Sequence, residues 1–357
     1  MNTSIKDKFG QMIMIGLDIE DINEEIIKLI KEYKIGGLVL YKKNYHDINS
    51  MRELVNRIKD INKNNVPLFI AIDQENGRVN RIPDEIERIY SAGRQASTGK
   101  IEIVNKCNLI TGEVLKSVGV NMNLAPVLDI LYDDSKIVGN RSYGTNKDMV
   151  IKYGIASMKD YQDEEIIPVV KHFPGHGLVS ADSHYLIPTI NDTKRMEEDL
   201  VVYECAINNG CDVIMVGHLK VSGCGREPAT INKEIIRKYL IDKYNYQGLI
   251  ITDDLRMNTM KYIYGIKNMI NKSIQAGCNI LMIKYKKGDT RRLYKDLYKM
   301  IDKGKIDNKL IEDSYEKIIK IKKKYNISNE IINDNLDIDK INEEIRRVNG
   351  DIDKDSN

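Results

Sequence analysis

The sequence predicts a (β/α)8 barrel of the TIM type, an α/β fold built as one large domain. Short apolar runs of strand-forming residues recur eight times along the chain, and amphipathic helical patterns lie between most of them. Continuous apolar strands that alternate with helices are typical of a parallel sheet covered by helices. Eight repeats favour closure into a barrel, and polar residues end most of the runs, where the active sites of such barrels are built.

The expected strands are residues 12–16, 37–41, 68–73, 122–129, 168–172, 213–218, 249–253 and 280–284. Between them, segments such as 24–31 and 233–240 carry Ile and Leu at three- and four-residue spacing, which indicates a helix with one apolar face. The alternative is an open doubly wound sheet. It is disfavoured because no glycine-rich dinucleotide-binding loop follows the first strand.

We expect the barrel to occupy residues 1–325 and a charged C-terminal extension to occupy residues 326–357. Residues 310–324 have the pattern of an outer helix of the barrel, whereas beyond Asn326 the composition turns to Asn, Asp, Lys and Ile. Residues 338–348 of the extension have an amphipathic pattern that indicates a further helix. A chain of 357 residues can bury a sizeable core as one domain.

Composition excludes several classes of partner. The chain has 55 basic and 53 acidic residues, a net charge of +2, which provides no general field for nucleic acid or an anionic membrane. There is no run of membrane-spanning length and no apolar core of a signal peptide near Met1, so we expect a soluble, cytoplasmic protein. The five cysteines lack C-x-x-C spacing and indicate a reducing compartment; they are Cys107, Cys205, Cys211, Cys224 and Cys278.

One loop concentrates groups that can transfer protons. His172, His176 and His184 fall within thirteen residues, together with Asp182. Imidazole is the side chain whose ordinary pKa lies near neutrality. Metal ligation is disfavoured because Pro174 and the glycines around His176 forbid a helix, and His176 itself equally suits a purely structural role. A carboxylate two residues from an imidazole can orient it, so the Asp182 and His184 pair favours catalysis.

A second signal is the pair Asp253 and Asp254 at the end of an apolar run. Adjacent carboxylates at a strand end repel each other and are tolerated mainly where cations or chemistry use the charge. Asp254 precedes a helical pattern from about Met257, so a helix N-cap explains it. Capping explains Asp253 less well. The other charged or polar residues expected at strand ends are Asp73, Asp129, Lys171, His172, His218 and Lys284.

With these residues in view, the chain resembles glycoside hydrolase family 3, and within it the single-domain β-N-acetylglucosaminidases (β-N-acetylhexosaminidases) that act on peptidoglycan fragments. The likeness runs from about Gly10 to about Lys284. Five ordered motifs carry it: Asp73-Gln-Glu-Asn-Gly-Arg78-Val-Asn-Arg81, Asn121-Met-Asn-Leu-Ala-Pro-Val-Leu-Asp129, Ile137-Val-Gly-Asn-Arg141-Ser-Tyr-Gly144, Lys171-His-Phe-Pro-Gly-His-Gly177 with Asp182-Ser-His184, and Thr252-Asp253-Asp254-Leu255-Arg-Met257.

The resemblance implies a retaining double displacement at a terminal GlcNAc of a muropeptide or disaccharide, without cofactor or metal. In it Asp253 matches the nucleophile, and His184 with Asp182 matches the acid/base dyad. The residues that match sugar-binding positions are Asp73, Arg81, Arg141, Lys171 and His172. For Arg81 and Arg141 the alternative is an ion pair that ties loops to the barrel rim.

The sequence departs from the family pattern in the loop after His176, where Leu178 and Val179 replace a usual Asp-Thr and remove a polar contact. Asn76 replaces a usual Gly, and Gly217 a usual Ala. Three other functions stay open: a phosphorylase that uses the same residues with phosphate as acceptor, a non-catalytic sugar-binding barrel, and a metal-dependent barrel hydrolase. The last is disfavoured because no two-His motif lies on the first strand.

Overall fold

The eight expected strands form one parallel sheet that closes into a barrel in the computed structural model, which describes residues 3–132, 135–179 and 187–355. The sheet runs in the order β10-β1-β2-β3-β4-β5-β7-β9, and a parallel bridge between Ile251 and Ile280 joins its two ends. Its strands are β1 (Ile13–Gly16), β2 (Gly37–Leu40), β3 (Phe69–Ile72), β4 (Met122–Asn123), β5 (Ile167–Phe173), β7 (Val213–Val216), β9 (Leu249–Thr252) and β10 (Leu281–Lys284). The predicted (β/α)8 fold is therefore confirmed.

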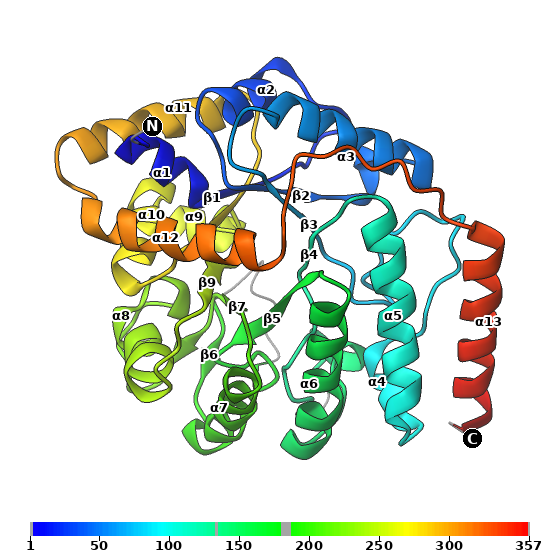
Figure 1. The fold of residues 1–357 in the computed structure, drawn as a ribbon. Coiled ribbons are helices and arrows are strands. Elements are labelled where there is room, and N and C mark those ends of the chain that lie inside the picture. The colour runs from blue at the N-terminus through cyan, green and yellow to red at the C-terminus, as the bar shows by residue number, and fades with distance from the viewer. Residues whose placement is uncertain (1–2, 133–134, 180–186, 356–357) are drawn as a thin grey trace.

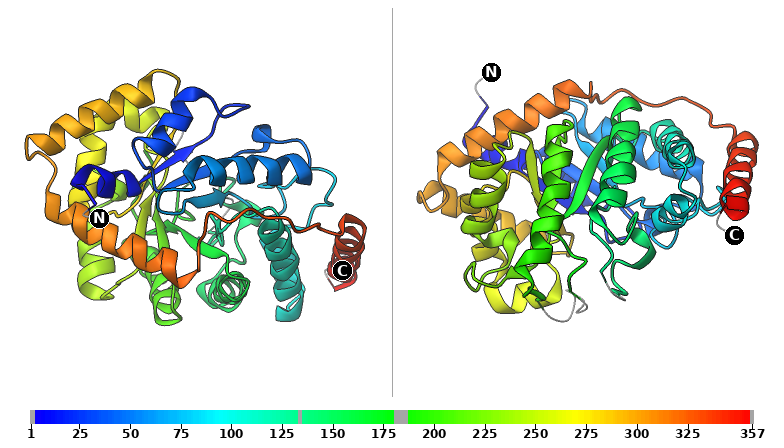
Figure 2. Two further views of the ribbon diagram at one scale, coloured as in Figure 1. Left: turned by 45° about the horizontal axis from the view of Figure 1, so that its top comes forward. Right: turned by 90° about the horizontal axis from the view of Figure 1, so that it is seen from below.

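Helices surround the strands, as Figure 1 and the two views of Figure 2 show. The α-helices are α1 (Ile5–Gln11), α2 (Glu24–Lys31), α3 (Ile48–Asn62), α4 (Ala92–Ser97), α5 (Ile101–Ser117), α6 (Lys147–Asp163), α7 (Thr193–Asn208), α8 (Lys233–Ile235), α9 (Asn258–Tyr264), α10 (Ile266–Ala276), α11 (Asp289–Asp302), α12 (Asn308–Lys324) and α13 (Ile338–Asp355). Short 3-10 turns are η1 (Lys42–Asn44), η2 (Gly139–Arg141) and η3 (Ala229–Ile231), and η4 (Ile236–Lys243) is a π-helical continuation of α8. Two short strands, β6 (Thr189–Ile190) and β8 (Lys220–Val221), pair outside the barrel.

Side-chain caps start several of these helices where the sequence places Asn or Asp. The side chains of Asn23, Asp47, Asn146, Asp192 and Asp307 each accept a hydrogen bond from a backbone N–H in the first turn that follows. Such a cap satisfies one of the N–H groups that a helix leaves without an internal partner. The turns between strands and helices are thus fixed by local sequence.

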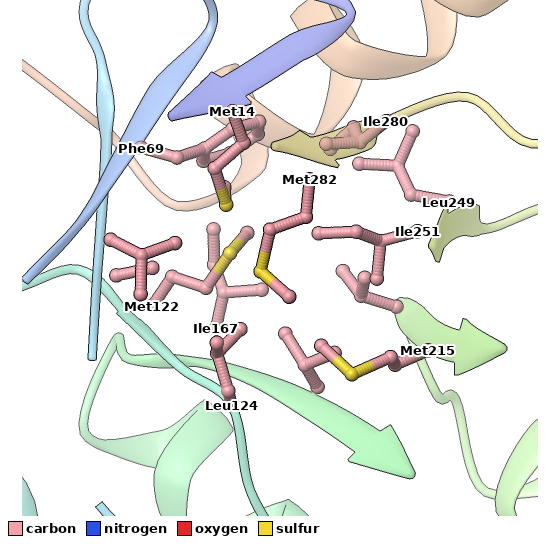
Figure 3. Close-up of a cluster of buried hydrophobic side chains, with 14 of the residues drawn as sticks. Met14, Phe69, Met122, Leu124, Ile167, Met215, Leu249, Ile251, Ile280 and Met282 are labelled. Atoms are coloured by element: carbon pink, nitrogen blue, oxygen red, sulfur yellow. The ribbon is translucent and has the colours of Figure 1, made fainter. Parts of the chain in front are cut away.

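The barrel interior is filled by apolar side chains with a large share of methionine (Figure 3). Met14, Met122 and Phe69 are fully buried there. Unbranched methionine side chains fill irregular space well. Gly37 leaves room for them, because a Cβ at this position would lie 3.0 Å from Met14 Cε and 2.8 Å from the Phe69 carbonyl oxygen. The interior of the barrel is therefore a packed core.

The C-terminal extension runs along one side of the barrel. After α12 the chain crosses to α13, which lies beside α5 in both figures. The apolar stripe Ile341, Ile345, Val348 and Ile352 of α13 is buried. The helix extends further than the amphipathic pattern at 338–348 indicated. Within the part of the chain that the structure describes, no helix is long and apolar enough to cross a membrane.

Candidate active site

A cavity of about 690 Å³ opens at the carboxyl ends of the barrel strands. Its floor is the upper layer of the barrel core, where Leu124, Met215 and Met282 are labelled in Figure 3. Polar side chains from the ends of the strands and from the loops form the wall: Tyr41, Asp73, Arg78, Arg81, Lys136, Arg141, Lys171, His172, His176, Asp253, Asp254 and Lys284. An apolar floor below convergent polar groups is typical of a small-molecule site.

An ion cluster forms one part of this wall. Lys171, near the end of β5, places Nζ 2.5 Å from Asp73 Oδ1 and 2.6 Å from Glu75 Oε1. Arg141 binds Glu75 in a bidentate manner, with Nε 2.6 Å from Oε2 and Nη2 2.8 Å from Oε1. The side chains of Lys171 and Glu75 are each only 3% exposed. Two loops and one strand are thereby held together by charge-assisted hydrogen bonds.

Each charge in the cluster is sustained by its neighbours. Burial alone would lower the pKa of Lys171, but the carboxylates of Asp73 and Glu75 outweigh this and raise it. Burial would raise the pKa of Glu75, yet the charges of Lys171 and Arg141 hold it well below the usual range. The side chains of Lys171 and Glu75 therefore both remain ionised at neutral pH.

Arg81 lies on the same side of the cavity and is less tightly held. Its Nη2 is 3.9 Å from Asp73 Oδ2, and its side chain is 28% exposed. Its backbone is fixed, because its N–H donates to Gln74 Oε1 at 2.7 Å and its carbonyl accepts from the Tyr45 hydroxyl at 2.9 Å. The guanidinium is consequently available to a ligand on a positioned backbone.

Asp129 contacts two histidines, His172 in β5 and His176 in the loop that follows it. Its Oδ2 is 2.7 Å from His172 Nδ1, and its Oδ1 accepts from the backbone N–H of His172 at 3.1 Å and of His176 at 2.7 Å. Burial would raise the pKa of Asp129, but His172 and these contacts lower it to about 2. The carboxylate thus takes Nδ1–H of His172 as a donor and leaves Nε2 as the other polar atom of a ring that lines the cavity.

Asp253 follows β9 directly and lines the cavity. Its Oδ1 accepts from the backbone N–H of Asp254 at 2.7 Å. Burial would raise its pKa, but His218, His172, that N–H and Lys171 together lower it. Asp253 is therefore an ionised carboxylate beside an apolar floor.

Asp254 has a different environment. Its Oδ1 accepts from the backbone N–H of Arg256 at 2.9 Å and of Lys284 at 3.0 Å. Burial, followed by the charge of Asp253, raises its pKa. The next helix, α9, begins only at Asn258, so the expected helix N-cap is wrong. Asp254 instead ties the turn after β9 to the end of β10.

The structure thus brings together Asp73, Arg81, Arg141, Lys171, His172 and Asp253 around one cavity, as expected. Asp182 and His184 lie outside the described residues. Glu75 was not expected from the sequence; its signal was its position two residues after Asp73, at the end of a strand, in a motif that contains two arginines. His176 is buried at the cavity wall, and burial followed by His172 lowers its pKa, so its ring is neutral.

No group of three or more His, Cys, Asp or Glu side chains is arranged to hold a metal ion within residues 3–132, 135–179 and 187–355. The histidines that line the cavity are instead engaged with Asp129.

Comparison with known proteins agrees with this geometry. A family model described as the glycosyl hydrolase family 3 N-terminal domain matches residues 4–321. The β-hexosaminidase of Photobacterium profundum is 32% identical over 267 residues, which cover 74% of this chain and 78% of the relative. The β-hexosaminidase of Tolumonas auensis is 30% identical over 275 residues, covering 74% and 81%. Among solved structures, a family 3 β-N-acetylglucosaminidase from Paenibacillus sp. str. FPU-7 superposes with a TM-score of 0.90 at 27% identity, covering 97% of this chain and 68% of that one.

Proposed function

The chain belongs to glycoside hydrolase family 3 and is a glycoside hydrolase, and on this basis we propose that it is a retaining exo-β-N-acetylglucosaminidase. The proposed substrate carries a non-reducing terminal GlcNAc on a peptidoglycan-derived fragment. The observation that carries the proposal is the ionised Asp253 in the cavity wall, among polar side chains suited to sugar hydroxyls.

Asp253 is the proposed nucleophile. Its carboxylate attacks the anomeric carbon, a C1–O bond to Asp253 forms, and the glycosidic C1–O bond breaks through an oxocarbenium-like transition state. His184, oriented by Asp182, protonates the leaving oxygen. In the second step the same imidazole accepts a proton from water, which attacks C1 and releases Asp253, so two inversions give net retention. The lowered pKa of Asp253 supports this role because the nucleophile must be a carboxylate.

The cluster around Lys171 is the proposed binding site for the terminal sugar. Asp73, Lys171 and His172 offer acceptors and donors to hydroxyl groups, and Arg81 adds a guanidinium whose only close carboxylate is at 3.9 Å among the described residues. Arg141 uses Nε and Nη2 for Glu75 and Nη1 for the Ile137 carbonyl, which supports the loop-tying role. Arg141 also lines the cavity and has five N–H groups, more than these contacts use, so it can serve the sugar as well.

The positive charge of the cavity wall supports a substrate whose leaving sugar carries a negatively charged substituent. The wall has six cationic side chains, Arg78, Arg81, Lys136, Arg141, Lys171 and Lys284, against the carboxyl groups of Asp73, Asp253 and Asp254. A muramyl unit carries a carboxylate beside the scissile bond and would gain from this field. Five free cysteines fit a reducing compartment, so we propose that the fragment is met in the cytoplasm during peptidoglycan recycling.

The decisive experiment follows the first-formed sugar by proton NMR with a chromogenic β-GlcNAc glycoside. Initial release of β-GlcNAc supports the proposal, and initial α-GlcNAc would overturn the mechanism. A second reaction with inorganic phosphate tests the acceptor: GlcNAc 1-phosphate of unchanged configuration would make the protein a phosphorylase. Absence of turnover on any GlcNAc glycoside would leave a sugar-binding barrel. Activity that is lost in a strong chelator and restored by a divalent metal would point to the metal-dependent class.

A further inference from the structure

Hydrogen bonds join the C-terminal helix α13 to the segment that follows Arg81. This segment, residues 82–91, connects Arg81 to α4 and contains no helix or strand. The extension first passes along α3, where Asn56 Nδ2 donates to the Ile332 carbonyl and Lys59 Nζ to the Glu330 carbonyl. It then places α13 beside α4 and α5 (Figure 1; Figure 2). The helix therefore lies behind the loop rather than at the cavity.

Two asparagines of α13 each make a pair of hydrogen bonds with the backbone of this segment. Asn342 Oδ1 accepts from the Glu87 N–H at 2.8 Å, and its Nδ2 donates to the Glu85 carbonyl at 2.8 Å. Asn349 Oδ1 accepts from the Tyr90 N–H at 3.2 Å, and its Nδ2 donates to the Arg88 carbonyl at 2.9 Å. In both cases the side-chain amide bonds to the carbonyl of one residue and to the N–H of the residue two positions later. A residue of a neighbouring parallel strand makes the same pair of hydrogen bonds.

The distance between the two asparagines along the helix matches the distance between their two binding points along the extended segment. Asn342 and Asn349 are seven residues apart, which is about 10.5 Å along a helix and returns to the same face. Their acceptors, the Glu85 and Arg88 carbonyls, are three residues apart, which is about 10 Å of extended chain. Asn342 and Asn349 thus bind the backbone of the segment in register, and these four hydrogen bonds do not involve the segment's side chains.

Further contacts hold the helix between the two asparagines and beyond Asn349. Arg346 Nη1 lies 2.7 Å from Glu87 Oε1, and the Tyr90 hydroxyl is 3.2 Å from Asp353 Oδ2. Lys100 Nζ lies 2.8 Å from Asp355 Oδ2. Together with the buried stripe of α13, these contacts hold the helix against this part of the barrel.

Residues 82–91 are in turn joined directly to the loop between Asp73 and Arg81. The Gly77 N–H donates to the Ile89 carbonyl at 2.9 Å, between the two Asn349 contacts. Gly77 also packs tightly on Ser91, because a Cβ there would lie 2.6 Å from Ser91 Cβ. Gly77 follows Glu75 by two residues and precedes Arg81 by four. A displacement of Ile89 would therefore move the turn between the ion cluster and Arg81.

We propose that Asn342 and Asn349 are positioning residues, which hold residues 85–90 and through them place Asp73, Glu75 and Arg81 for sugar binding. The sugar as ligand rests on the function proposed above. The C-terminal extension, although outside the cavity, thereby sets the affinity of the site.

The test compares Asn342→Ala/Asn349→Ala with Arg347→Ala in the full chain. Arg347 is the matched control because its ion pair with Glu343 stays within α13. Hydrogen–deuterium exchange reports on peptides that cover residues 77–91, and kinetics use p-nitrophenyl N-acetyl-β-glucosaminide. We expect faster exchange at residues 77–91 in the double variant alone. We also expect KM to rise roughly fivefold or more, with kcat changed less, since the misplaced groups bind the sugar in ground and transition states alike.

Unchanged exchange at residues 77–91, or faster exchange with an unchanged KM, would overturn the proposal. If the double variant does not fold, Asn349→Ala alone carries the test, because its contacts flank Ile89. If the wild-type protein hydrolyses no GlcNAc glycoside, the proposed function fails, and the exchange measurement alone then decides whether α13 holds the loop.

Discussion

Replacement of Glu75 by glutamine tests the ion cluster with little change in shape. Glutamine retains the length and one carbonyl oxygen of the side chain but removes its charge. Lys171 would keep Asp73, at 2.5 Å, as its carboxylate partner, whereas Arg141 would lose the bidentate ion pair. The variant therefore separates the charge of Glu75 from its volume.

The expected loss of stability follows from the burial of the cluster. Breaking a buried ion pair by removing one partner costs about 3–5 kcal/mol because a charge is left uncompensated. We expect the lower end, about 3 kcal/mol, since glutamine still accepts a hydrogen bond and Asp73 remains. The exposed pair of Glu165 with Lys116 provides the control, and Glu165→Gln should cost about 1 kcal/mol or less.

The loss should also depend on pH in a defined direction. The pKa of Glu75 is lower in the folded protein than in the unfolded chain, because Lys171 and Arg141 outweigh its burial. Its contribution is therefore complete above the unfolded pKa and is lost as pH falls toward the folded value. The stability difference between wild type and Glu75→Gln should be full at pH 7 and narrow below about pH 4.5.

Urea unfolding at pH 7 and at pH 3.5, followed by circular dichroism, measures both effects. A loss below 1 kcal/mol at pH 7 would refute the reasoning about burial. A difference of equal size at both pH values would show that the charge of Glu75 is not its cause.

Three further predictions concern the reaction. Asp253→Asn should lower turnover of a chromogenic GlcNAc glycoside by several orders of magnitude without loss of the fold, and a fluorinated slow substrate should label Asp253; a label on Asp254 would contradict the assignment. His184→Ala should lose roughly 10²–10⁴-fold on poor leaving groups and less on good ones, whereas equal losses on both would argue against an acid/base role. Asp129→Asn should weaken sugar binding about tenfold, measured as a rise in KM, because His172 loses the carboxylate that fixes its tautomer; an unchanged KM would mean that the His172 ring does not contact the sugar.

The sequence was sufficient for the fold because the strands are continuous apolar runs buried on both faces. It also located Asp73, Lys171 and Asp253, because charged residues at the carboxyl ends of the strands of a barrel all lie at the same end of it. Glu75 and Asp129 were harder. Asp129 was recognised only as a strand end, because its contacts with His172 and His176 join residues more than forty positions apart in the sequence. Glu75 lies within a loop, where no periodicity indicates which side chain is buried.

The contacts of α13 with residues 85–90 could not be predicted from the sequence, for a different reason. Its amphipathic pattern indicated a helix but not the surface that it covers, and Asn342 and Asn349 contact backbone groups, which leave no trace in the side chains of residues 85–90. The role of Asp254 was likewise misread, because its carboxylate bonds to Lys284 on a strand that lies thirty residues further along the chain.

The departures from the family pattern have physical explanations in the structure. Asn76 has a φ of 68°, a left-handed conformation that asparagine adopts more readily than most residues, and its amide donates to Thr111 Oγ1 at 3.2 Å. A Cβ at Gly217 would lie 3.2 Å from His172 Cβ, so glycine avoids a tight contact with this side chain.

The departure at Leu178 and Val179 changes the type of contact at the start of the loop that leads to Asp182. Val179 is buried and Leu178 packs against the core, so apolar burial replaces the polar contact usual in the family. Gly177 just before them has no space for a side chain, since a Cβ would lie 1.7 Å from the Ile130 carbonyl oxygen. The chain is therefore fixed up to Val179 by packing against the segment after Asp129. Because the Asp129 carboxylate also holds His172 and His176, the start of the loop that leads to Asp182 and the wall of the cavity share one support.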